Sequence, residues 1–503
     1  MAQQLQRSAS RATETPGGPR RLHLTAAAVA LALAGGLLTA VAAPATAAPR
    51  AGLTADDADF NGDGYADVAA SAPFAYVGGR KGAGATVVTY GRAGGVGRVA
   101  TYTQNSPGVP GTAEAGDLFG NELAYGDFDG DGYDDLLASV AGEDVGRDKD
   151  GGSAQILWGS RSGLKGGTSL KDPRPAAHDH FGGVLKSGDF DGDGKEDIAL
   201  GTVTTATVDV YRGGFTRGGR TGGHSTLTPR IHGDGETGVR NLHSGDANGD
   251  GKEDLIVNGY ENDTERGYNA NFWIPGSRSG LKVSAAQKLT PGVITDLGDT
   301  DEDGYDDVVI GNFWDSGIAG SARGGAVHVA HGSARGPAHG EREKFTQNTP
   351  GVPGGSERGD AFGNELDLGD VDGDGNLDLV VGAPGETVDG VEDSGAVTVL
   401  YGAADGSGLT GDGARLLTQN SPGVPNADEK HDFLGTDVRA DDLNGDGRAD
   451  LVLGAHGENG GNGAVYPLLS RPDGSLRGTT GIYTSTAAIP GTGTPRLGAN
   501  FAD

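Results

Sequence analysis

The sequence predicts an all-β protein, a seven-bladed β-propeller with four short strands in each blade. Three observations lead to this fold class. A nine-residue acidic loop recurs seven times, each copy is followed by a short apolar run, and Gly-rich turns divide each repeat into strand-like segments. Repeats of this length with four strands each are typical of propellers. The 95 glycines show no three-residue period, which excludes a collagen-like chain.

Residues 1–47 are predicted to be a signal peptide. Four arginines between Arg7 and Arg21 precede an apolar stretch at 24–41, and residues 45–47 (Ala-Thr-Ala) match the small-x-small pattern that signal peptidases cleave. The apolar stretch could also be a transmembrane anchor, but the well-placed cleavage pattern favours removal. The mature chain, residues 48–503, is therefore expected to be secreted, with no membrane span.

Charge and cysteine content narrow the classes of partner. The net charge is −31, and removal of residues 1–47, which hold four Arg and Glu14, leaves −34. Repulsion at this charge excludes binding to nucleic acid or to an anionic membrane surface. Divalent cations, basic partners and neutral glycans remain possible. Because the chain has no Cys, it contains no disulfides.

The acidic loop organises the predicted propeller. Its first copy runs from Asp59 to Asp67, and the other copies begin 53 to 72 residues apart at positions 127, 189, 246, 299, 370 and 442. Each copy keeps a carboxylate or amide at positions 1, 3 and 5, Gly at position 6 and Asp at position 9. Gly at position 6 permits the sharp turn that brings alternate side chains to one side.

These oxygen-rich loops are predicted to bind Ca²⁺, up to seven ions in all, because Ca²⁺ takes six to eight oxygen ligands. Side chains at positions 1, 3, 5 and 9 and the backbone carbonyl of position 7 would supply them. In loops one to four the predicted ligands are Asp59, Asn61, Asp63, Tyr65, Asp67; Asp127, Asp129, Asp131, Tyr133, Asp135; Asp189, Asp191, Asp193, Lys195, Asp197; and Asp246, Asn248, Asp250, Lys252, Asp254. In loops five to seven they are Asp299, Asp301, Asp303, Tyr305, Asp307; Asp370, Asp372, Asp374, Asn376, Asp378; and Asp442, Asn444, Asp446, Arg448, Asp450.

The loops are not EF-hands. An EF-hand needs a bidentate Glu at position 12 and a helix on each side. Here position 12 is apolar in every copy, as in Ala138 and Val381, and lies in a short β-branched or aliphatic run. We therefore expect each loop to join the first and second strands of a blade.

The remaining strands are predicted from further repeated segments. A third strand is expected at 85–91 and at 396–402, and a connector, Thr-Gln-Asn-x-Pro-Gly-Val-Pro, recurs at 103–110, 346–353 and 418–425. The C-terminal run at 489–502 resembles the connector and first strand of another repeat without its loop. We expect it to pair with the first blade and close the ring, which removes two exposed sheet edges.

The repeats resemble the FG-GAP family. Phe-Gly pairs occur at 119–120, 181–182 and 362–363, and Gly-Ala-Pro follows a loop at 382–384. The resemblance covers essentially the whole mature chain and implies the seven-bladed propeller found at the head of integrin α chains. The fourth and fifth repeats depart from it, since they lack Phe-Gly. In integrins only some blades carry the cation loop, whereas all seven repeats carry it here.

The search for catalytic motifs favours a binding protein. No Gly-x-Ser-x-Gly, His-Glu-x-x-His or phosphate loop is present. His178 and His180 could bind zinc but are better explained as loop variation, and Trp158, Trp273 and Trp314 are expected in blade cores rather than stacked on sugars. We therefore expect a non-enzymatic, monomeric module for adhesion to an extracellular protein or glycan. The alternative is a hydrolase, because similar propellers accompany glycosylphosphatidylinositol phospholipase D.

Overall fold

The computed structural model describes residues 53–54, 57–175, 177, 179–233, 237–261, 269–338 and 343–503. The signal peptide predicted for residues 1–47 lies outside these ranges and stays a prediction.

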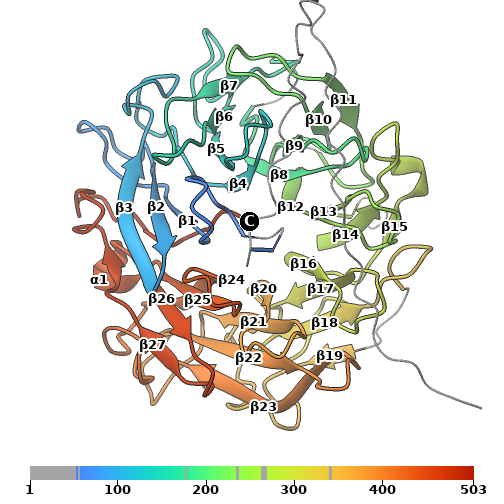
Figure 1. Ribbon diagram of the computed structural model, residues 1–503, viewed down its shortest axis with the longest axis vertical. Helices are drawn as coiled ribbons and strands as arrows, with labels where there is room; N and C mark the ends of the chain where they lie inside the picture. The colour runs from blue at the N-terminus through green and yellow to red at the C-terminus, as the bar shows by residue number, and fades with distance from the viewer. Residues whose placement is uncertain are drawn as a thin grey trace, which may run out of the picture. The chain divides into compact units, whose positions relative to one another are not determined.

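The described residues form seven antiparallel sheets, arranged as the blades of a propeller (Figure 1). The strands of blades 1 to 4 are β1 (Val68–Ala72), β2 (Ala85–Arg92), β3 (Gly95–Tyr102); β4 (Leu123–Gly126), β5 (Asp135–Val140), β6 (Ser153–Leu157), β7 (Thr168–Leu170); β8 (Val184–Gly188), β9 (Asp197–Gly201), β10 (Val208–Arg212), β11 (Gly223–Leu227); and β12 (Val239–Gly245), β13 (Asp254–Tyr260), β14 (Asn269–Ile274), β15 (Gln287–Lys288).

Blades 5 to 7 repeat the same meander. Their strands are β16 (Ile294–Gly298), β17 (Asp307–Asn312), β18 (Ala326–Ala330), β19 (Glu343–Phe345); β20 (Glu365–Gly369), β21 (Asp378–Ala383), β22 (Ala396–Gly402), β23 (Leu409–Leu417); and β24 (Leu434–Asp441), β25 (Asp450–Ala455), β26 (Ala464–Ser470), β27 (Leu476–Gly478), β28 (Ile482–Tyr483). Two single-turn helices, η1 (Val283–Ala285) and α1 (Glu458–Gly461), complete the described elements. The seven-bladed, nearly all-β prediction is confirmed.

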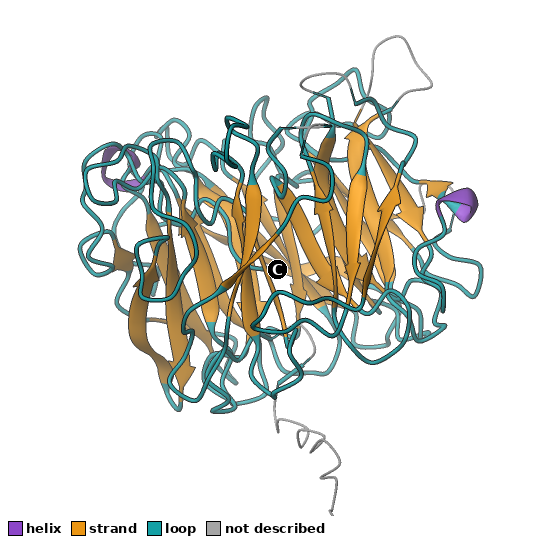
Figure 2. Cartoon of the chain, turned by 90° about the horizontal axis from the view of Figure 1, so that it is seen from above, coloured by secondary structure: helices purple, strands orange, loops and turns teal. Residues whose placement is uncertain are grey.

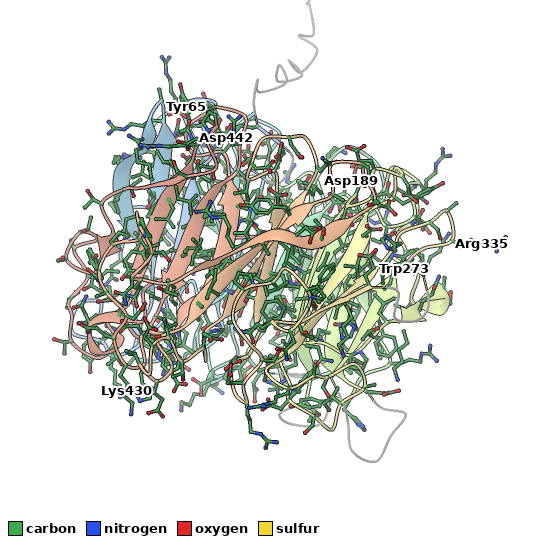
Figure 3. All side chains as sticks on the ribbon, turned by 90° about the horizontal axis from the view of Figure 1, so that it is seen from below. Tyr65, Asp189, Trp273, Arg335, Lys430 and Asp442 are labelled. Atoms are coloured by element: carbon green, nitrogen blue, oxygen red, sulfur yellow. The ribbon has the colours of Figure 1, made fainter. Side chains whose placement is uncertain are left out.

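The meander gives the propeller two different ends, seen edge-on in Figure 2. The acidic loops lie between the first and second strands of the blades, so they all lie at one end, which we call the loop end. The connectors between blades, such as 346–364 and 418–433, lie at the other end, which we call the connector end. In Figure 3 Tyr65, Asp189 and Asp442 lie at the loop end and Lys430 at the connector end.

The C-terminal segment supplies the missing inner strand of blade 1. Phe501 forms an antiparallel bridge with Ala70 of β1. The N–H of Ser71 donates to the carbonyl of Asn500 at 2.7 Å, and the N–H of Ala502 donates to the carbonyl of Ala69 at 2.9 Å. The closure predicted from residues 489–502 is therefore confirmed, and the chain end lies near the propeller centre (Figure 1).

The repeated Gly residues are explained by contacts between neighbouring blades. A Cβ on Gly382, the first residue of Gly-Ala-Pro, would lie 2.2 Å from the carbonyl oxygen of Gly435 in the next blade. The same close approach joins Gly311 to Gly363 and, across the ring closure, Gly454 to the C-terminal Gly498. Only Gly allows blades to pack this closely. At each interface a Gly near the end of the second strand therefore meets a Gly that begins the next repeat, preceded by Phe at Gly363 and by Leu at Gly435 and Gly498.

Candidate cation-binding loops

The seven loops share one backbone conformation. The Gly at position 6 has a positive φ in every copy, from +75° at Gly251 to +97° at Gly375. A side chain at either position would meet no atom within 4 Å, so the conformation, not space, requires Gly. Loop five departs at position 4, where Glu302 adopts φ +55° while the other six copies have Gly.

The Asp at position 1 holds the turn together. In the first loop, Oδ1 of Asp59 accepts hydrogen bonds from the N–H groups of Gly62 and Asp63 at 2.6 and 3.1 Å. Its Oδ2 accepts one from Gly64 at 2.9 Å. The same three bonds form around Asp370 and Asp442. This carboxylate therefore orders the loop through bonds within the protein itself.

The Asp at position 9 joins the loop to the third strand. Its Oδ1 accepts a hydrogen bond of 2.6 to 3.0 Å from a backbone N–H near the end of that strand in all seven blades. The pairs are Asp67–Gly91, Asp135–Gly159, Asp197–Gly213, Asp254–Gly276, Asp307–Gly332, Asp378–Gly402 and Asp450–Ser470. From the sequence, position 9 was predicted only as a cation ligand, so this structural role is an addition.

Position 3 differs between loops in a regular way. Where it is Asn, as in Asn248 and Asn444, its amide donates to the Asp of position 9 at 2.8 to 3.0 Å. Where it is Asp, a basic group lies beside it. Arg217 of blade 3 reaches into loop two and donates to Asp129 and Asp131 at 2.8 Å each. The other three loops with Asp at position 3 also have a basic group nearby.

The basic groups beside the other three position-3 aspartates come from different elements. Nη1 of Arg212 lies 3.4 Å from Asp191, and Nδ1 of His331 lies 3.2 Å from Asp301. Nε of Arg448 donates to the backbone carbonyl of Asp372 at 3.2 Å.

Burial and mutual repulsion make these carboxylates costly to ionise. Burial raises the pKa of Asp67 to about 9 and that of Asp135 to about 8, and other carboxylates of the loop add to both rises. In loop five, burial is outweighed by hydrogen bonds, chiefly from His331, which hold the pKa of Asp307 below its usual value. The hydrogen bond to Asp307, with a second to Glu343, raises the pKa of His331 to about 10.

The loop residues fit a hard divalent cation. Among the described residues, the buried Oδ1 atoms of Asp129, Asp191 and Asp301 accept no hydrogen bond. Three carboxylates come within 4.8 Å of one another in loops two, three and five. All these donors are oxygen, which Ca²⁺ prefers. Calcium would neutralise the repulsion and use the unpartnered oxygens, while coordination by the position-7 carbonyls stays a prediction.

The sequence also suggested tryptophans and histidines as possible sugar or zinc contacts. Trp158 and Trp273 are buried, as expected for core residues. Trp314 is different: it lies in the loop after β17, partly exposed and stacked on Phe313 with ring centroids 5.0 Å apart, so its assignment to a blade strand is wrong. His180 lies 2.9 Å from the carbonyl of Ala141, and His178 lies outside the described residues.

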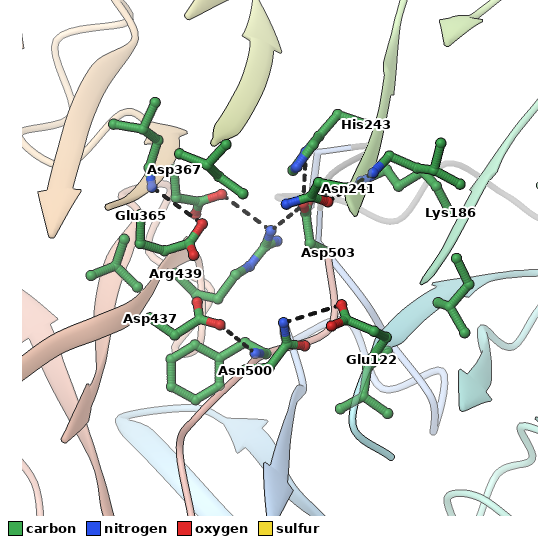
Figure 4. Close-up of a pocket in the computed structure, with 17 residues that line it drawn as sticks. Glu122, Lys186, Asn241, His243, Glu365, Asp367, Asp437, Arg439, Asn500 and Asp503 are labelled. Carbon is green, nitrogen blue, oxygen red and sulfur yellow. Dashed lines mark hydrogen bonds and ion pairs between the residues drawn. The ribbon is translucent and has the colours of Figure 1, made fainter. Parts of the chain in front are cut away.

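A charged cluster on the propeller axis was missed by the sequence analysis (Figure 4). Arg439 of β24 is buried and donates to Asp367 of β20, to Asp441 and to Asp503 at 3.1, 2.7 and 3.2 Å. Lys186 of β8 also reaches Asp503, at 3.0 Å. These ion pairs connect the inner strands of four blades, so they help to hold the ring together. The residues of the cluster lie far apart in the sequence and have no repeated spacing that could reveal them.

Comparisons with known proteins identify the repeats. The FG-GAP repeat model matches residues 58–89, 119–157, 362–400 and 434–466, and the FG-GAP-like repeat model matches 189–257. Integrin alpha pat-2 of Caenorhabditis briggsae is 32% identical over 269 residues, 53% of this chain and 18% of that protein. Integrin alpha-PS5 of Drosophila melanogaster is 31% identical over 164 residues, 31% of this chain and 15% of that protein.

Two further matches come from other kinds of protein. The phosphatidylinositol-glycan-specific phospholipase D of Dictyostelium discoideum is 28% identical over 195 residues, 37% of this chain and 19% of the enzyme. This chain thus spans less than a fifth of the curated relatives named here. A solved Agrocybe aegerita lectin, described as recognising non-reducing terminal N-acetylglucosamine, aligns with a TM-score of 0.50 at 16% identity. It covers 87% of this chain and 95% of its own, and shows the fold alone.

Among the residues that the structure describes, no helix has the length and apolar character needed to span a bilayer.

Proposed function

We propose that this chain, which carries FG-GAP repeats on an integrin-like propeller, is an extracellular, calcium-stabilised binding module. In this proposal the loop end binds Ca²⁺ for stability and the connector end recognises an extracellular protein or glycan. The observation that supports this proposal most is the sevenfold repetition of the acidic loop. The repeats offer many oxygen ligands for ions and contain no recognised catalytic motif.

The ions serve the scaffold in this proposal. For an extracellular-type site with a Kd of about 10⁻⁴ M, millimolar Ca²⁺ contributes about 1.4 kcal/mol of stability. Seven such sites would add roughly 10 kcal/mol, which is comparable to the stability of a whole domain. A chain without disulfides gains from such a source.

The connector end offers a candidate contact for a ligand. Phe313 and Trp314 follow β17 at this end, and both stacked rings are partly exposed. Aromatic rings present flat apolar surfaces on which the C–H faces of sugars pack, with Trp supplying a polar N–H as well. Among the two ligand classes, this pair favours a glycan.

A glycan array probed with the mature protein in millimolar Ca²⁺ tests the proposal. We expect a restricted set of glycans to bind, with Trp314→Ala losing at least tenfold in affinity and Trp314→Phe losing less. A folded wild-type protein that binds no glycan contradicts the glycan assignment and directs the search to protein ligands. The phospholipase D match supports shared repeats, not a shared reaction, because it covers 19% of that enzyme.

A further inference from the structure

A buried glutamine recurs at three of the described connectors between blades. The side chains of Gln104, Gln347 and Gln419 are 2, 2 and 1% exposed. Each Nε2 donates to the glutamate 39 residues further along, at 2.5, 2.5 and 2.6 Å; the acceptors are Glu143, Glu386 and Glu458. The Oε1 atom of all three glutamines is buried and has no hydrogen-bond partner. Buried side-chain acceptors in native proteins almost always have a partner, so each of these oxygens requires a water molecule or an ion beside it.

The geometry is clearest where blade 5 meets blade 6. A Cβ on Gly324 would lie 3.2 Å from Oε1 of Gln347, 3.0 Å from Oδ2 of Asp360 and 2.7 Å from the carbonyl oxygen of Glu357. Three oxygens from the connector therefore surround a space beside Gly324 that a side chain would fill. Gly324 has φ +80°, a conformation that disfavours any other residue.

Two buried carboxylates give this space a negative charge. Asp360 is 2% exposed and Glu386 is 8% exposed. The two carboxylates repel each other. A water molecule could satisfy Oε1 of Gln347, but it would leave this charge uncompensated.

We propose that Gln347, Asp360 and the carbonyl of Glu357 bind one hard divalent cation of the Ca²⁺ type at the connector end, with the carboxylate of Glu386 next to them. The three donors are all oxygen and comprise an amide, a carboxylate and a backbone carbonyl, the mixture that Ca²⁺ sites use. The site is separate from the acidic loops, because connectors and loops lie at opposite ends of the blades. It would fix the connector at the end where we place ligand recognition.

Blades 2 and 7 carry related but altered versions of this site. The N–H of Phe362 donates to the carbonyl of Gly324, and Ala83 and Ser394 accept the equivalent bonds in the other two blades. Both of those residues carry a side chain where Gly324 has none. In blade 7 the Tyr466 hydroxyl also donates to Glu458, at 2.9 Å. The site beside Gly324 is therefore the most open of the three and the one to test.

An anomalous difference map from crystals of the mature protein grown in calcium tests the proposal directly. We expect a calcium peak between Gln347, Asp360 and Glu357 with oxygen distances near 2.4 Å. Asp360→Asn should remove this peak and one bound ion per chain while the loop peaks remain. The matched control Asp372→Asn, in the acidic loop of the same blade, should remove only its own loop peak. A water molecule without anomalous signal at this place, or no density there at all, overturns the proposal.

A second variant covers the case in which Asp360→Asn does not fold. Gln347→Glu removes the donor to Glu386 and adds a third carboxylate. With a cation bound, we expect the melting-temperature gap between calcium and chelator to be wider than in the wild type. An equal loss of melting temperature in both conditions contradicts the site. Because loop and connector peaks are separate, failure of the loops to bind calcium would leave this result readable.

Discussion

Asp135 and Gly159 are joined by a hydrogen bond of 2.6 Å, in which the backbone N–H of Gly159 donates to Oδ1 of Asp135. The bond connects the end of the acidic loop to the residue that leaves the third strand of the same blade. Because the equivalent bond is present in all seven blades, position 9 has a structural task as well as a predicted place around the ion.

Positions 9 and 3 of a loop should therefore respond differently to mutation. Asp135→Ala leaves a buried N–H without an acceptor, so we expect a loss of about 1–3 kcal/mol even in the presence of chelator. Asp129→Asn should cost little in chelator, because it relieves repulsion, and should weaken calcium binding. Urea unfolding of both variants with and without calcium checks this. Equal losses for the two variants in chelator would show that position 9 has no separate role.

Arg217 should compete with calcium in the second loop. Its guanidinium donates to Asp129 and Asp131, and half of its side chain is exposed. A positive charge about 4 Å from a divalent ion costs roughly 1–2 kcal/mol in a highly solvated site. We expect Arg217→Gln to tighten calcium binding by severalfold, measured by calorimetric titration, while Arg220→Gln in the same turn changes nothing. Weaker binding in Arg217→Gln would mean that the arginine supports the site.

The C-terminal strand should be essential for stability. Phe501 is 2% exposed and packs in the cluster that joins blades 1 and 7. Phe501→Ala leaves a cavity at this closure, so we expect a loss of about 3–5 kcal/mol in the free energy of unfolding. The control is Val145→Ala, because Val145 is 42% exposed. Its free energy of unfolding should differ from that of the wild type by no more than about 0.5 kcal/mol. If both variants unfold at the same urea concentration, the closure contributes little.

His456 should make the propeller sensitive to acid. Burial, followed by repulsion from Arg496, lowers its pKa to about 4, and its ring stacks on Phe433 with centroids 5.1 Å apart. The unfolded chain takes up this proton near pH 6.5 and the folded chain only near pH 4. Between these values the unfolded state binds more protons, so stability is present above pH 6.5 and is lost as the pH falls.

Lowering the pKa from 6.5 to about 4 corresponds to roughly 3 kcal/mol of stability, most of which is lost by pH 4.5. We expect His456→Gln, which cannot take up the proton, to lose less stability than the wild type between pH 7 and pH 4.5. Equilibrium unfolding across this range measures the difference. Parallel pH profiles for the two proteins would show that another group causes the acid sensitivity.

The repeated part of the architecture was predictable from the sequence. Seven copies of one loop, which begin 53 to 72 residues apart, indicated seven blades, and the run at 489–502 indicated closure. Gly382 shows the physical basis, since its close approach to Gly435 recurs between Gly311 and Gly363 and between Gly454 and Gly498. Trp314 could not be placed because Asn-Phe-Trp at 312–314 replaces the Ala-Pro-Gly found at 383–385 in the sixth repeat.

Long-range charge pairs were the part that the sequence did not reveal. Arg439 meets Asp503 and Asp367 only because inner strands from different blades converge on the axis. The Gln347–Glu386 pair did leave a signal, since the same residues recur 39 positions apart in three blades. The spacing alone does not show that the two side chains touch. That contact depends on the direction of the strands, which came from the structure.

The most direct test of the account is the thermal unfolding of the mature protein in millimolar calcium and after exhaustive chelation, with bound ions counted by elemental analysis. The loops alone predict up to seven ions per chain and a melting temperature lower by roughly 10 °C without calcium, from about 10 kcal/mol of linked stability. An unchanged melting temperature, or a folded protein that holds no calcium, would contradict the central claim that these loops are a cation-stabilised scaffold.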